Sequence, residues 1–127
     1  MVLTARRLLA FAGVPHNGRN FEYASGEDPF LGYHLVNGAI KGIQSENVIA
    51  NAKHWVQNNE ETNRHGVTEI VDDRTRFEMY YPPFAGAVDA GVGSIMCSCA
   101  FPHIARSDAA TPAAVAAIAA RCSCCCG

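Results

Sequence analysis

Stretches with helical periodicity alternate along this chain with short apolar runs, and that order limits the folds it can adopt. The first stretch predicts an amphipathic helix over 29–45, because its apolar residues recur about every four positions. They are Leu31, Leu35, Ala39 and Ile43, with Val36 and Ile40 beside them. Asp28 suits the N-cap and Pro29 the first helical position. Gly32, Gly38 and Gly42 each weaken a helix by about 1 kcal/mol relative to Ala, so tertiary packing must hold it.

A second helix is expected over 73–90. Asp72 and Asp73 can cap its start. Its buried stripe is expected to include Phe77 and either Tyr80 or Tyr81.

Two prolines interrupt this second helical pattern. Pro82 and Pro83 should kink or break the helix, and Gly91 should end it. Beyond the prolines the apolar face continues at Phe84, Ala87 and Val88. Short apolar runs follow each helix and predict buried strands near 48–53 and 93–97, the first of them buried on both faces.

Strands that alternate with helices pair in parallel through crossover connections, so the fold class is α/β. If such a sheet closes as a barrel, functional groups gather where its strands end. Lys53 and His54 stand at the end of the first predicted strand and can face a crevice there. The alternative is that both are solvated loop residues. The densely polar stretch at 57–66 is expected to be a loop. Arg19, taken alone, is typical of a surface arginine.

Composition excludes several classes of protein. The chain has 127 residues, the length of one domain. Ten Lys and Arg against twelve Asp and Glu give a net charge of -2, which argues against a nucleic-acid partner. No run of about eighteen apolar residues is present, so no membrane span is expected.

The residues after 98 differ from those before. Of the 21 residues in 100–120, ten are Ala, and four of the six Cys lie in the last six positions. The sequence therefore divides into a globular region at 14–98 and an Ala- and Cys-rich tail at 99–127. Translation out of frame or a mis-predicted exon explains the tail most simply. Metal binding, palmitoylation and disulfide pairing are alternatives, but the spacing of Cys122, Cys124, Cys125 and Cys126 does not fit a structural zinc site, and we expect no metal and no cofactor.

Residues 1–13 form a weakly determined N-terminal stub. Arg6 and Arg7 precede a short apolar run, as in a secretory signal, but no small-residue cleavage site follows. The other interpretation is a strand or helix stub.

Several motifs in order resemble glycoside hydrolase family 3, and within it the beta-glucosidase type. The likeness covers about 14–98, two thirds of the chain. The matching segments are Gly18-Arg19-Asn20-Phe21-Glu22, Glu27-Asp28-Pro29, Lys53-His54-Trp55-Val56 with Asn58, Glu60 and Glu61, Asp73-Arg74-Thr75, Tyr80 with Pro82-Pro83-Phe84, and Ser94-Ile95-Met96-Cys97-Ser98.

This resemblance implies a partial (β/α)8 barrel of the TIM type, about half of one, because a whole barrel needs about 200–250 residues. It implies hydrolysis of β-glucosides or oligosaccharides with retention of configuration, and the family is often secreted. Arg19, Lys53 and His54 are implied to bind the hydroxyls of the terminal sugar. Supporting roles are implied for Glu22, Asn58, Glu61 and Arg64, with a structural salt bridge or turn as the alternative for each. The resemblance also implies a cis peptide at Trp55-Val56.

The chain departs from the family pattern after Ser98. Members continue with Tyr-Asn, whereas this chain has Cys99 and Ala100. A Ser-Asp-Trp-like segment with the nucleophilic Asp is not found, and Ser107-Asp108 comes too early and lacks the aromatic residue. We therefore assign no catalytic residue to this chain and expect it to be inactive alone. The alternative function is a non-catalytic carbohydrate-binding or non-functional truncated product.

Overall fold

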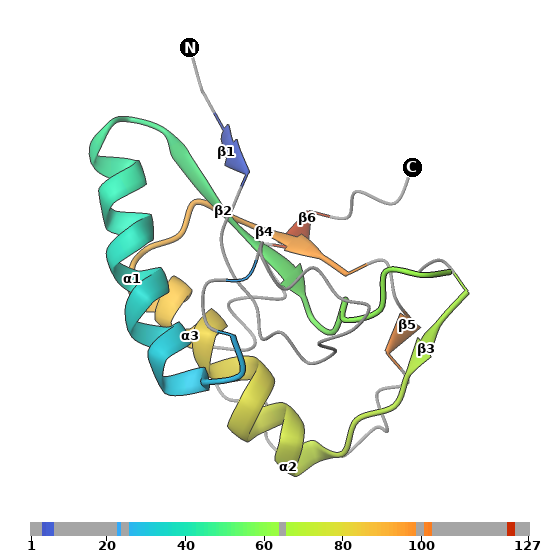
Figure 1. The fold of residues 1–127 in the computed structure, drawn as a ribbon. Helices are drawn as coiled ribbons and strands as arrows, with labels where there is room; N and C mark the ends of the chain where they lie inside the picture. The colour runs from blue at the N-terminus through green and yellow to red at the C-terminus, as the bar shows by residue number, and fades with distance from the viewer. Residues whose placement is uncertain are drawn as a thin grey trace.

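The structure is a computed structural model that describes residues 4–6, 23, 26–63, 66–98, 101–102 and 122–123. Helices lie on one side of a parallel sheet (Figure 1). The elements in chain order are β1 (Thr4–Arg6), α1 (Pro29–Ser45), β2 (Ile49–Trp55), β3 (Thr68–Glu69), α2 (Asp73–Thr75), the π-helical η2 (Arg76–Tyr80), α3 (Tyr81–Asp89), β4 (Ser94–Cys97), β5 (Phe101–Pro102) and β6 (Cys122–Ser123).

Parallel pairing joins the strands in the order β1-β2-β4-β6. Ala52 of β2 lies opposite Ile95 of β4 in this register. The two predicted strands are therefore present and parallel, as the alternation of helices and strands indicated. Strands β3 and β5 form a second parallel pair, apart from the larger sheet in Figure 1. Among the described residues, no helix is both long and apolar enough to cross a membrane.

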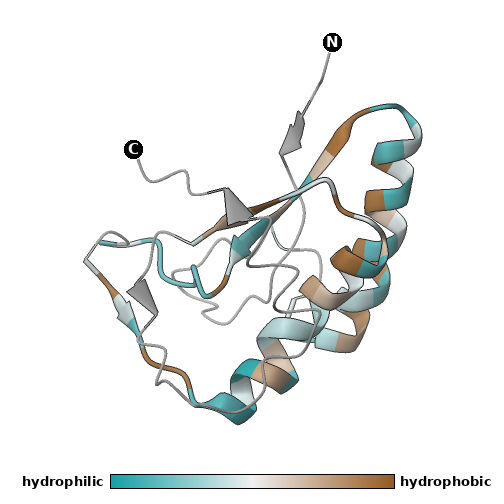
Figure 2. Cartoon of the chain, turned by 180° about the vertical axis from the view of Figure 1, so that it is seen from behind, coloured by the Kyte–Doolittle hydropathy of each residue, from teal (hydrophilic) through white to brown (hydrophobic). Residues whose placement is uncertain are grey.

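Helix α1 begins and ends where the sequence predicted. The backbone N–H of Leu31 donates to Asp28 Oδ1 at 3.0 Å, and Pro29 occupies the first turn. Its buried face runs through Gly32, Val36 and Ile40. Leu31 and Leu35 are each 45% exposed, so the expected stripe was wrong for these two leucines. Polar and apolar residues alternate around the helix in Figure 2.

The second helical stretch widens at the prolines instead of breaking. Pro82 and Pro83 have no N–H to donate to the carbonyls four residues before them. The Tyr81 N–H bonds the carbonyl of Arg76, five residues back, and η2 results. This wider turn rotates the helix face. Arg76 and Tyr80 are buried, whereas Phe77 is 42% exposed, so the expected burial of Phe77 was wrong.

One hydrophobic core lies between the helices and the sheet. Trp55, near the end of β2, stacks on Tyr81 with ring centroids 4.9 Å apart and meets Phe84 edge-on at 5.0 Å. Its partners come from the start of α3, so these rings join the end of the strand to the helix layer. The buried core residues are Val36, Ile40, Ala50, Ala52, Val56, Tyr80, Phe84, Ala87, Val92 and Ile95.

Helices α1 and α3 come into close backbone contact at Gly86. A Cβ built on Gly86 would lie 2.4 Å from the carbonyl oxygen of Tyr33 and 2.9 Å from its Cα. The Asn37 side chain donates to the Gly86 carbonyl at 3.2 Å. The Tyr33 hydroxyl donates to the Asp89 carboxylate, and this bond raises the pKa of Tyr33. Backbone packing at Gly86 therefore sets the distance between the two helices.

We predict that Gly86→Ala destabilises the chain by about 1–3 kcal/mol, because the added methyl group would overlap the backbone of Tyr33. The matched control is Gly42→Ala in α1, where nothing lies within 4 Å of an added Cβ. That change should stabilise the chain by up to about 1 kcal/mol through helix propensity alone. Urea unfolding followed by circular dichroism measures both. Equal effects of the two substitutions would contradict the close approach.

We also predict an acid-dependent contribution from the cap at Asp72. Bonds from the Thr75 N–H at 3.0 Å and the Thr75 hydroxyl at 2.7 Å lower the pKa of Asp72 below 3.8. Because the folded pKa is the lower one, this contribution is present above pH 3.8 and is lost as the pH falls through the folded pKa. Asp72→Asn keeps an acceptor that does not titrate. The stability difference between wild type and Asp72→Asn, measured by urea unfolding, should shrink below that pH, and a constant difference would refute the assignment.

Candidate functional site

The ends of β2 and β4 bring two sequence motifs side by side. Lys53 lies opposite Met96 and Trp55 opposite Cys97, with a register shift between Lys53 and Trp55. The Ser98 N–H donates to the Trp55 carbonyl at 2.6 Å. The Ser98 hydroxyl donates to the carbonyl of Gln57 at 3.0 Å. The strand ends and the loop after β2 are thus held together where functional groups gather in parallel α/β folds.

His54 lies at this register shift and is buried, with 7% of its surface exposed. Shifts of this kind re-aim a side chain. The Asn58 Nδ2 and the Tyr23 hydroxyl each lie 3.4 Å from His54 Nδ1. The Tyr23 hydroxyl donates to the Asn58 carbonyl at 3.3 Å. The tautomer of the ring decides whether Nδ1 accepts from Asn58 or donates to Tyr23, and in both cases these contacts hold the ring in place.

Three polar atoms of β2 and the loop after it are buried and have no hydrogen-bond partner within the part of the chain that the structure describes. They are Asn51 Oδ1, Gln57 Nε2 and Asn58 Oδ1. A buried polar group without a partner costs about 1–3 kcal/mol. The described residues of the polar stretch 57–66 form a loop, as expected, but Gln57 and Asn58 lie inside the protein, and Gln57 has a φ of 67°. Donors and acceptors of this kind suit a ligand rich in hydroxyls.

A second polar cluster lies next to the first. The backbone N–H of Asn59 donates to Glu69 Oε1 at 2.9 Å, and its Nδ2 donates to Glu69 Oε2 at 3.2 Å. The same Nδ2 donates to the Tyr80 hydroxyl at 2.7 Å. Burial raises the pKa of Glu69, against the effect of these bonds, and burial also raises the pKa of Tyr80. Glu69 and Tyr80 come from β3 and η2.

Among the residues expected to form the site, the structure brings His54 and Asn58 together. Lys53 precedes His54 in β2 and is half-buried, and Glu61 is exposed in the loop. Arg19, Glu22 and Arg64 lie outside the described residues. Convergence of Arg19, Lys53 and His54 on one cavity therefore stays a prediction.

The backbone confirms one detail and adds another. The cis peptide expected at Trp55-Val56 is present, and a second one, which the sequence did not indicate, joins Lys53 to His54.

Sequence reasoning missed Tyr23, Gln57, Asn59 and Glu69. Tyr23 directly follows the matched segment 18–22, and its hydroxyl could have marked it as a candidate. Asn59 and Glu69 are ten residues apart in a polar loop and a two-residue strand, and no local spacing marks such a pair.

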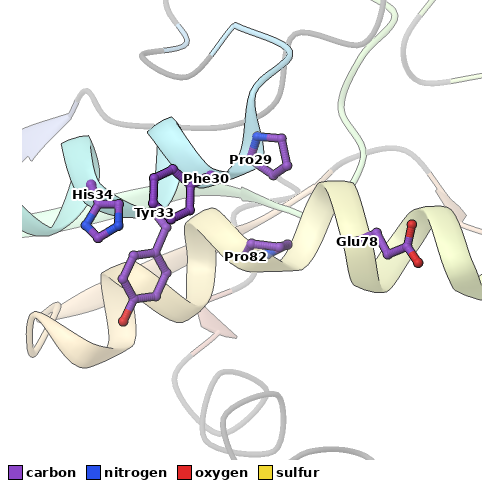
Figure 3. A pocket seen from close by; sticks show the side chains of 6 residues that line it. All are labelled: Pro29, Phe30, Tyr33, His34, Glu78 and Pro82. Atoms are coloured by element: carbon purple, nitrogen blue, oxygen red, sulfur yellow. The ribbon is translucent and has the colours of Figure 1, made fainter.

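A cavity of about 400 Å³ lies elsewhere, between the start of α1 and the junction of η2 with α3. Figure 3 shows Phe30, Tyr33 and His34 along α1, with Pro82 on the neighbouring helix. Phe30 is 73% exposed, and His34 meets Phe30 and Tyr33 edge-on. None of its lining residues comes from the end of β2, so this cavity is distinct from the candidate site.

Comparison with known proteins finds beta-glucosidases among the relatives of this chain. Beta-glucosidase cel3A of Pyricularia oryzae is 46% identical over 89 residues, which are 70% of this chain and 12% of that protein. DesR, a beta-glucosidase from Streptomyces venezuelae solved with D-glucose, has a TM-score of 0.73 and 32% identity over 81% of this chain and 13% of its own. Beta-glucosidase 3B from Thermotoga neapolitana, solved with glucose, has a TM-score of 0.71 and 37% identity over 80% of this chain and 14% of its own.

This chain thus spans about an eighth of the length of the relatives it matches. The family described as "Glycosyl hydrolase family 3 N terminal domain" matches residues 8–118, most of the chain. The order of motifs, the parallel sheet and these relatives agree, and the chain belongs to glycosyl hydrolase family 3.

Proposed function

We propose that these 127 residues form part of the sugar-binding pocket of a beta-glucosidase. In this pocket, the end of β2 binds the terminal glucose unit. The relatives are named as beta-glucosidases, and two of the similar structures were solved with glucose. The parallel strands with helices on one side are consistent with about half of a (β/α)8 barrel. In that fold, substrates bind at the ends of the strands.

The observation that carries this proposal is the buried polar cluster around His54. Tyr23 and Asn58 contact Nδ1 and hold the ring in place. Gln57 Nε2 supplies a donor and Asn58 Oδ1 an acceptor, and both are buried without a partner among the described residues. A sugar hydroxyl donates and accepts at once, so it can satisfy groups of both kinds.

Lys53 adds a cationic donor directly before His54. Charge-assisted hydrogen bonds to hydroxyls are stronger than neutral ones, and those that strengthen in the transition state lower its free energy. Arg19 is proposed to complete the pocket with Lys53 and His54. Glu22, Asn58, Glu61 and Arg64 are proposed to support them.

The bond-breaking step requires groups that this chain does not supply. Retaining hydrolysis uses a carboxylate nucleophile and a separate acid/base about 5 Å apart, with a covalent glycosyl-enzyme intermediate. Lys53 and His54 orient the sugar and stabilise charge, and neither is a carboxylate. The 127 residues alone are therefore proposed to bind glucose without cleaving a glucoside.

We predict that the 127-residue chain binds glucose and that Lys53→Ala weakens this binding. A hydrogen bond from a charged donor contributes about 1.5–3 kcal/mol, so Kd should rise about 10- to 100-fold. Lys41→Ala, on the exposed side of α1, is the matched control and should leave Kd unchanged. Isothermal titration calorimetry measures all three. A Kd that is the same in both variants would exclude Lys53 from the site.

We further predict no measurable turnover of an aryl β-glucoside by the same chain, because no residue fills the nucleophile's role. A chromogenic assay of wild type and Lys53→Ala tests this. Turnover that persists in Lys53→Ala would indicate a contaminating enzyme. Turnover that this substitution abolishes would show that the chain holds a working catalytic site and would overturn the prediction.

A further inference from the structure

Asn59 is held by three hydrogen bonds to two different elements. Both oxygens of the Glu69 carboxylate accept from it, one from the backbone N–H and one from Nδ2. Nδ2 has two protons, and the second is donated to the Tyr80 hydroxyl at 2.7 Å. Every donor of Asn59 is therefore used, and its backbone and side chain are both fixed.

Asn58, which directly precedes Asn59, belongs to the proposed sugar site. The Asn58 Nδ2 lies 3.4 Å from His54 Nδ1, and the Asn58 carbonyl accepts from Tyr23. Because Asn58 and Asn59 share a peptide unit, a change in the backbone of Asn59 moves the Asn58 carbonyl. Glu69 and Tyr80 both bond Asn59, so the loop links them to the residue beside the His54 ring.

Glu69 is well suited to hold the loop because it is partly withdrawn from water. Burial raises its pKa most, while the backbone N–H groups of Asn59 and Glu60 oppose that rise, and the Glu60 carboxylate adds a smaller repulsive effect. Glu69 and Tyr80 also lie on β3 and η2, outside the strand that carries His54. Two elements with separate packing therefore fix one loop.

We propose that Glu69 and Tyr80 are positioning residues, which act through Asn59 to fix Asn58 and thereby orient His54 for sugar binding. The inference rests on the proposed function for its consequence in glucose affinity. The claim that Glu69 fixes the position of His54 through the loop can be tested without any ligand.

The test compares three variants of the full 127-residue chain. Glu69→Gln keeps the shape but turns an amide NH2 toward one of the Asn59 donors. Tyr80→Phe removes only the hydroxyl acceptor. Glu78→Gln makes the same chemical change on an exposed carboxylate that is bonded to Arg74, and serves as the control.

Nuclear magnetic resonance records the Asn58 side-chain amide and the His54 ring nitrogens, assigned with Asn58→Ser and His54→Gln. In Glu69→Gln we expect both sets of signals to shift and the ratio of the ring's tautomers to change, with smaller shifts of the same sense in Tyr80→Phe. Glu78→Gln should match wild type. Glucose Kd should rise about fivefold to tenfold in Glu69→Gln, the loss expected for a neutral hydrogen bond at the site.

The outcomes separate this proposal from the one it rests on. If wild type binds no glucose, the proposed function fails for this chain, and the ligand-free spectra still decide whether Glu69 positions His54. A lower melting temperature in Glu69→Gln with unmoved Asn58 and His54 signals would show a merely structural role and overturn the inference. If Glu69→Gln does not fold, Tyr80→Phe decides, and unmoved signals there would overturn it equally.

Discussion

The pairing of β2 with β4 determines where the polar groups of this molecule meet. The two strands are parallel, so both end at the same edge of the sheet, and the Ser98 N–H closes that edge on the Trp55 carbonyl at 2.6 Å. An antiparallel pair would place the end of one strand beside the start of the other. The helix layer depends on the same pairing, because Trp55 packs on Tyr81 and Phe84 of α3.

Helix α1 controls the other end of β4. Gln44, in its last turn, accepts from the Gly93 N–H at 2.9 Å and donates to the Gly91 carbonyl at 3.1 Å. Gly91 has a φ of 76°, a conformation that costs glycine little. The turn from α3 into β4 is therefore fixed by a side chain 47 residues away. Contacts of this range require the helix and the strand to be placed together.

Local chemistry made much of the fold predictable. The Asp28-Pro29 start of α1 and the Asp72 cap depend on neighbours within three residues, and both are present as expected. The buried faces were less predictable, because they depend on the partner helix. Packing of α3 through Gly86 buries Gly32, Val36 and Ile40 and leaves Leu31 outside. The π-helical turn then rotates Phe77 outward, a result of two prolines that periodicity alone does not show.

The candidate site also has a part that the sequence predicts and a part that it does not. Lys53 and His54 could be found because they stand at the end of an apolar run, whereas the groups around them come from distant segments. Tyr23 is 31 residues from His54, and Glu69 reaches the loop from a strand of two residues. Buried polar side chains cost free energy unless they are bonded, and here several are bonded while three atoms have no partner among the described residues. A preorganised binding site requires side chains that are held in place beside unsatisfied donors and acceptors. The side chains are then already ordered before the ligand arrives.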